Sequence, residues 1–135
     1  MRRKYEQENN IKYDWVIQTR PDILFKTPFD IDNILDCYKQ YNLPIPSDAL
    51  YYAYNPFRGM GCEDWRWIAG SDLIYFSTPE NMNKATALYQ NFDKNIDINN
   101  FYCFEVWWME FWKKQGLEPM ALNYIQFRDF DIVRL

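Results

Sequence analysis

The chain has 135 residues, of which 48% are apolar and 20% aromatic, enough for one domain with a real hydrophobic core. This composition excludes a disordered chain, and a net charge of −4 makes duplex nucleic acid and anionic membranes poor partners. No apolar run reaches the length of a membrane span.

The content of histidine and cysteine narrows the possible chemistry. The chain has no histidine, which excludes Ser-His-Asp and Cys-His catalysis and every His-ligated zinc site. Cys37, Cys62 and Cys103 are widely spaced and fit neither a disulfide framework nor a CxxC metal knuckle. They predict reduced, mostly buried thiols in a cytoplasmic protein.

The first half of the chain predicts two helices and two strands. Residues 2–10 are typical of the last turns of a helix that leads into a strand, as in a piece of a longer protein. The β-branched and apolar run 15–19 predicts a buried strand. A helix is expected at 31–41, with Asp30 as its N-cap, followed by a short strand at 49–54. Residues 55–62 carry turn formers and predict a loop.

The second half predicts strands, two helices and strands again. One or two strands are expected over 65–76, and the capping-box spacing from Ser77 to Glu80 starts a helix at 79–92. A polar loop covers 93–100, a helix with apolar residues three and four apart covers 102–115, and Gly116 stops it. Two short strands are expected within 117–135. Residues 1–135 thus predict a single domain of α/β (α+β mixed) class with a mixed sheet.

The strand at 15–19 leads to the first candidate site. Pro21 removes a ladder donor and holds Arg20 extended, so the strand should end near Arg20. Arg20 and Asp22 then lie at the carboxyl end of the strand, which is where open α/β sheets bind ligands. A cation and an anion two residues apart indicate a charged, hydroxyl-rich ligand.

Three blocks of the sequence resemble one family. Residues 13–25 (YDWVIQTRPDILF) resemble the "YDxVIRxRPDL" strand of glycosyltransferase-like proteins with a GT-A fold. Residues 63–71 (EDWRWIAGS), with Met82, are similar to the family's "DRFxxGS…M" segment. The stretch from Phe104 through Gly116 to Arg134 resembles its "PE…L…GI…IxR" tail.

The resemblance implies a nucleotide-sugar-dependent glycosyltransferase that transfers a sugar to a glycan acceptor. It further implies that residues 1–135 are the carboxyl-terminal portion of a GT-A-like mixed sheet flanked by helices. The amino-terminal nucleotide-binding strands of the fold are not recognised in the sequence. A fragment of this kind is not expected to transfer sugar alone.

The resemblance also implies roles for individual residues. In GT-A enzymes the equivalent strand ends in a DxD motif whose carboxylates hold Mn²⁺ or Mg²⁺ on the donor diphosphate. Asp22 matches the last Asp as a metal ligand, whereas Arg20 stands where the first would be, so its guanidinium would grip the diphosphate itself. Glu105 corresponds in place to the catalytic base of inverting members.

Four further residues are candidate contacts. Asp64 would bind an acceptor hydroxyl or a sugar, and Trp65 and Trp67 beside it would offer stacking surfaces. Arg134 would reach a phosphate.

Each role has a structural alternative. Asp22 is also a good turn residue, Arg20 a partner for Asp22 or Asp14, and Glu105 a first-turn acid that compensates a helix dipole. Asp64 suits a solvated loop equally well, and Arg134 a surface ion pair. For the whole chain, the alternative function is a non-catalytic carbohydrate- or partner-binding domain.

Overall fold

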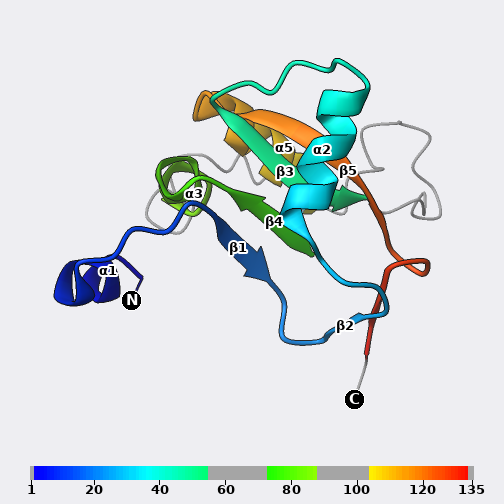
Figure 1. The fold of residues 1–135 in the computed structure, drawn as a ribbon, viewed down its shortest axis with the longest axis horizontal. Coiled ribbons are helices and arrows are strands. Elements are labelled where there is room, and N and C mark those ends of the chain that lie inside the picture. The colour runs from blue at the N-terminus through cyan, green and yellow to red at the C-terminus, as the bar shows by residue number, and fades with distance from the viewer. Residues whose placement is uncertain (1, 55–72, 88–103, 134–135) are drawn as a thin grey trace, which may run out of the picture.

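The computed structural model describes residues 2–54, 73–87 and 104–133 (Figure 1). They form helices and strands of a mixed α/β class, as the sequence predicts. The helices are α1 (Arg2–Asn9), α2 (Ile31–Gln40), α3 (Pro79–Ala85) and α5 (Phe104–Lys114). The strands are β1 (Val16–Thr19), β2 (Ile23–Phe25), β3 (Ala49–Tyr54), β4 (Ile74–Ser77), β5 (Glu118–Ile125) and β6 (Phe130–Ile132).

The main sheet has the strand order β1-β4-β3-β5 and is mixed. β4 is antiparallel to both β1 and β3, whereas β3 and β5 are parallel. It follows that β1, β3 and β5 run in the same direction, and their carboxyl ends lie at one end of the sheet, here called the carboxyl end of the sheet. β2 and β6 follow β1 and β5 along the chain and form a separate antiparallel pair.

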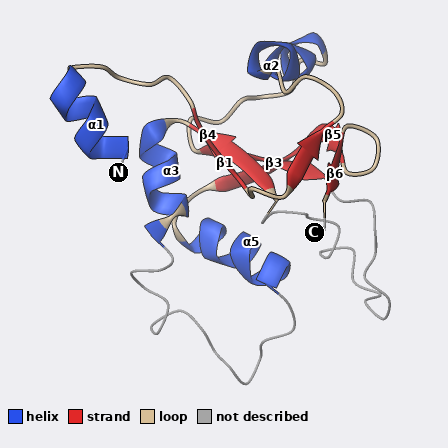
Figure 2. Ribbon diagram, turned by 90° about the horizontal axis from the view of Figure 1, so that it is seen from below, coloured by secondary structure: helices blue, strands red, loops and turns tan. Residues whose placement is uncertain are grey.

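Helices cover both faces of the sheet, with α2 on one side and α3 and α5 on the other (Figure 2). Alternate residues of the strands face these two layers, as the two-residue period of a strand requires. The cluster on the α2 side contains Leu35, Ala49, Tyr51, Ala53, Leu73, Ile74, Phe76, Leu122, Tyr124 and Phe130. The cluster on the α3 and α5 side contains Leu50, Tyr52, Tyr75, Met82, Ala85, Phe111, Trp112 and Leu117.

Aromatic rings make up much of both clusters. The ring of Tyr51 stacks on that of Phe76, with centroids 4.9 Å apart, and Trp15 meets Phe76 edge to face at 5.7 Å. On the other face, the centroids of Tyr75 and Trp112 are 5.1 Å apart. Trp112 is completely buried in this cluster.

The ends of the helices follow their sequence signals. Asp30 caps α2 by accepting a hydrogen bond from the N–H of Asn33. Gly116, with φ of +71°, follows α5 in the left-handed conformation that stops a helix. The N-cap of α3 is Thr78, whereas Ser77 ends β4 and donates its buried hydroxyl to the carbonyl of Ala49.

Some expectations need correction. β1 exists as predicted, but three of its four residues are exposed, because it lies at the end of the strand order instead of inside the sheet. The sequence did not predict β2 as a strand. The helix expected at 79–92 ends at Ala85, and residues 88–92 lie outside the described ranges. Cys37 is exposed, contrary to the expected burial of the thiols.

Among the described residues, no helix has both the length and the apolar character needed to cross a bilayer.

Phe76 is the residue whose loss should damage this fold most clearly. Its side chain is completely buried, so Phe76→Ala should lower the free energy of unfolding by about 3–5 kcal/mol. Leu24→Ala is the matched control on β2, where the side chain is 53% exposed, and it should change stability by no more than about 0.5 kcal/mol. Urea unfolding of both variants checks this. Similar losses of stability in the two variants would show that Phe76 does not lie in the core.

Candidate functional site

The residues that follow β1 form a tight turn at the carboxyl end of the sheet. The N–H of Ile23 donates to the carbonyl of Arg20 at 3.4 Å, which closes a four-residue turn. Pro21 occupies the second position of this turn, where its fixed φ is favourable. The proline therefore does more than end the strand, because it brings the side chains of Arg20 and Asp22 to the same side.

Arg20 and Asp22 meet in a two-pronged ion pair. Nε of Arg20 donates to Oδ1 of Asp22 at 2.9 Å, and Nη2 donates to Oδ2 at 2.6 Å. The two side chains are 43% and 31% exposed, so solvent reaches the pair. The salt bridge that the sequence left open as an alternative is thus formed, and it uses both carboxylate oxygens of Asp22.

Two neighbouring segments fix the main chain of this turn. The N–H of Arg20 donates to the carbonyl of Leu73, just before β4, at 3.3 Å. The N–H of Val133, just after β6, donates to the carbonyl of Asp22 at 2.8 Å. The ion pair therefore projects from a backbone that both the main sheet and the β2–β6 pair hold.

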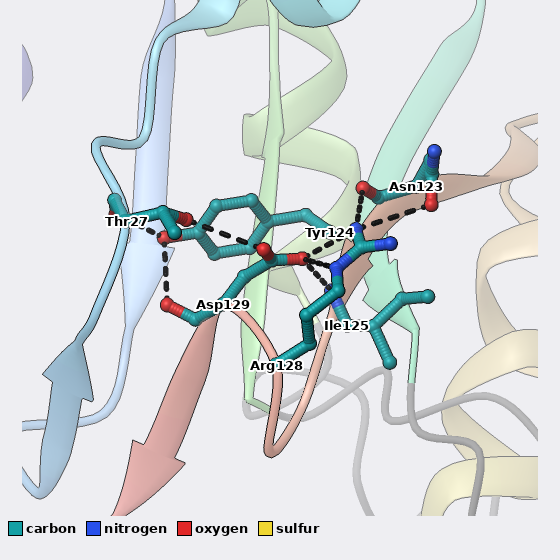
Figure 3. A network of polar contacts seen from close by, with 6 residues as sticks. All are labelled: Thr27, Asn123, Tyr124, Ile125, Arg128 and Asp129. Atoms are coloured by element: carbon teal, nitrogen blue, oxygen red, sulfur yellow. Dashed lines mark hydrogen bonds and ion pairs between the residues drawn. The ribbon is translucent and has the colours of Figure 1, made fainter.

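A polar network centred on Asp129 joins the β2–β6 pair to the end of β5 (Figure 3). The carboxylate of Asp129 accepts hydrogen bonds from Arg128 at 2.6 and 2.8 Å and from the N–H of Ile125 at 2.7 Å. Its carbonyl accepts from the N–H groups of Lys26 and Thr27, at 2.8 and 3.1 Å. The network thus ties together β5, β6 and the residues after β2.

The Asp129 side chain is only 10% exposed, so its charge depends on these donors. Burial raises the pKa of the carboxyl group, but hydrogen bonds from Arg128, the Ile125 N–H and Thr27 outweigh burial and hold the pKa below its usual value. Sequence reasoning missed this residue. The sequence gives no clear signal for it, because Asp129 stands between Arg128 and Phe130, with a second acid at Asp131.

The other predicted site residues fall mostly in parts of the chain that the structure does not describe. Asp64, Trp65, Trp67 and Arg134 lie outside the described residues. Glu105 lies in the first turn of α5, and only its backbone is described. Because α5 ends shortly before β5 begins, this first turn lies at the end of the helix away from the start of β5.

The described residues at the turn do not fit a divalent cation. Mg²⁺ and Mn²⁺ prefer several oxygen ligands, and this turn offers one carboxylate whose two oxygens already bind Arg20. In the described part of the chain, no group of three or more acidic or cysteine side chains lies close enough to hold a metal. What the turn does offer is a guanidinium fork, which matches the geometry of phosphate as well as that of carboxylate.

Comparison of the chain with protein-family models, with curated proteins and with solved structures finds no match. The glycosyltransferase resemblance therefore stays an expectation from three sequence blocks.

The Asp129 network predicts how stability depends on pH. Because the pKa of Asp129 is lower in the folded state, its stabilisation is complete above the unfolded value of about 3.9 and is lost as the pH falls through the folded value. Asp129→Asn should lower the free energy of unfolding by about 1–3 kcal/mol at pH 7, because it removes the charge from these hydrogen bonds. Its deficit relative to the wild type should shrink in acid.

Asp131→Asn is the control, because this carboxylate is 35% exposed and forms a surface ion pair with Lys26. Such a pair contributes about 0–1 kcal/mol. Urea unfolding of the three proteins between pH 2 and 7 gives the comparison. An Asp129→Asn deficit that stays constant with pH would contradict the assigned role of the carboxylate.

Proposed function

We propose that this chain is a glycosyltransferase-like protein that binds the diphosphate of a nucleotide sugar at the Arg20–Asp22 turn. The observation that carries the proposal is the solvent-accessible guanidinium fork of Arg20 at the carboxyl end of β1. That position agrees with the general location of ligands in open α/β sheets. The mixed sheet flanked by helices also agrees with the GT-A-like architecture that the resemblance implies.

The geometry of the pair favours an exchange of partners on ligand binding. A diphosphate offers Arg20 the same two-pronged acceptor geometry that Asp22 now supplies, and it carries more negative charge. In the proposal, the phosphate oxygens replace the carboxylate on the guanidinium. The released carboxylate of Asp22 then accepts hydrogen bonds from hydroxyl groups of the donor sugar. Arg20 thereby supplies the charge neutralisation that a metal ion provides elsewhere.

The remaining roles follow from the resemblance. Glu105 is proposed as the general base that takes the proton of the acceptor hydroxyl, since an inverting transfer needs one such base. Asp64, Trp65 and Trp67 are proposed to contact the sugar or the acceptor, and Arg134 a phosphate.

Thermal shift with UDP-, GDP- and CMP-sugars, each with and without manganese, tests the donor site. A ligand that binds only the folded protein raises its melting temperature with concentration. We expect one nucleoside diphosphate sugar to raise the melting temperature, with little change when manganese is added. No shift with any nucleotide, from a folded sample, would contradict the proposal and favour the alternative, a non-catalytic carbohydrate- or partner-binding domain.

Two variants separate the contributions of the turn. Arg20→Lys should weaken binding of both the nucleotide sugar and the free nucleoside diphosphate by about tenfold or more, because lysine cannot form the fork. Asp22→Asn should weaken binding of the nucleotide sugar but not binding of the free nucleoside diphosphate. Neither variant should lower the free energy of unfolding by more than about 1 kcal/mol, because the pair is exposed to solvent. Equal losses for both ligands in Asp22→Asn would refute the exchange.

Glu105 is tested separately from the donor site. In a longer protein that contains this chain and transfers sugar, Glu105→Gln should slow transfer to a glycan by about a hundredfold or more, while leaving the donor-induced thermal shift unchanged. Glu110→Gln, an exposed carboxylate on the same helix, is the control and should keep full activity. Release of nucleoside diphosphate in the presence of a glycan mixture measures the rate. Full turnover by Glu105→Gln would assign the base to another residue.

A further inference from the structure

β1 is an edge strand of the main sheet, and in the described part of the structure it pairs with β4 alone. Three of its four residues are exposed, and the side chain of Ile17 is 46% exposed. An edge strand of this kind presents unpaired N–H and C=O groups to its surroundings.

The register of the β1–β4 pair shows which residues of β1 present these groups. Arg20 lies opposite Leu73 if the β1–β4 ladder is continued, and the N–H of Arg20 does donate to the carbonyl of Leu73. Antiparallel pairs alternate between residues that exchange hydrogen bonds with the partner strand and residues that face away from it. The main-chain groups of Gln18 therefore face β4, whereas those of Ile17 and Thr19 face the open side of the sheet.

The two edges of the sheet differ in their protection. Natural edge strands avoid further pairing by being very short or by means of charged side chains, proline or bulges. β5, at the opposite edge, begins with Glu118 and Pro119, has an irregular register near its end, and receives a hydrogen bond from Tyr38 at the carbonyl of Ala121. β1 is short, with four residues, but it consists of Val, Ile, Gln and Thr and carries no charge, proline or bulge.

We propose that two copies of this chain associate through antiparallel pairing of their β1 strands. A two-fold axis through Gln18 places Ile17 of one copy opposite Thr19 of the other. The outward N–H and C=O groups of these residues then form four hydrogen bonds across the axis.

The side chains of β1 are complementary to themselves in this register. Gln18 meets Gln18 of the second copy, and the two amides can each donate and accept. Ile17 packs against the methyl group of Thr19, a pairing of β-branched side chains that suits a sheet surface. No charges of like sign lie opposite each other within the strand, and the nearest charge, that of Arg20, is already paired with Asp22. This self-complementarity is why the proposed occupant is a second copy.

Charge variants at Gln18 test the axis directly. Sedimentation equilibrium of the wild type should show a monomer–dimer equilibrium. Gln18→Lys and Gln18→Glu each place like charges opposite one another and should each weaken the dimer by about five- to tenfold. An equimolar mixture of the two variants should restore dimerisation, because unlike charges then meet. Gln18 is exposed, so neither variant should disturb folding.

The controls are Gln40→Lys and Gln40→Glu, the same change at an exposed position on α2, and they should leave the dimer unchanged. Thr19→Pro removes two of the four proposed hydrogen bonds without removing one to β4 and should abolish association, with circular dichroism confirming the fold. A wild type that stays monomeric at its highest soluble concentration would overturn the proposal. So would a mixture of Gln18 variants no more dimeric than either alone. Since none of these readouts involves a nucleotide, the proposal stands or falls independently of the proposed function.

Discussion

The antiparallel insertion of β4 between β1 and β3 is the constraint on which the rest of the structure depends. All four residues of β4 are buried, because helices cover both faces of the sheet at this strand. Because β4 is antiparallel to both of its neighbours, β1 runs the same way as β3 and its parallel partner β5, so the carboxyl ends of the three strands gather at one end of the sheet. The residue before β4, Leu73, also accepts the hydrogen bond that anchors Arg20. The same strand therefore organises the core and positions the candidate site.

Local signals in the sequence predicted the elements well where the determining contacts are local. Asp30 and Gly116 mark helix ends by bonds and dihedral angles within a few residues, and both were predicted correctly. β2 was missed because it has three residues and its partner, β6, lies at the other end of the chain. The burial of β1 was predicted wrongly, because a β-branched run indicates a strand but not its place in the sheet.

The candidate site shows the same division. The sequence identified Arg20 and Asp22, but it left open whether they serve a ligand or each other, since both depend on the same proximity. The structure shows that the proline turn brings them together at hydrogen-bonding distance. The supporting network around Asp129 was not predicted as a whole. Arg128 and Ile125 donate from nearby in the sequence, but Lys26 and Thr27 donate from the end of β2, at the other end of the chain. A pattern within one segment contains no information about such contacts.

The two proposals meet in β1, which forms the open edge and also leads directly into the Arg20 turn. A short strand that is paired on one side only opens more easily than a central strand, and both a ligand at Arg20 and a second copy paired with Ile17 and Thr19 would favour its closed form. Coupling of this kind is reciprocal, so a ligand that orders the turn would also favour association. If both proposals hold, donor binding and dimerisation should therefore strengthen each other, even though no residue of one copy need touch the ligand of the other.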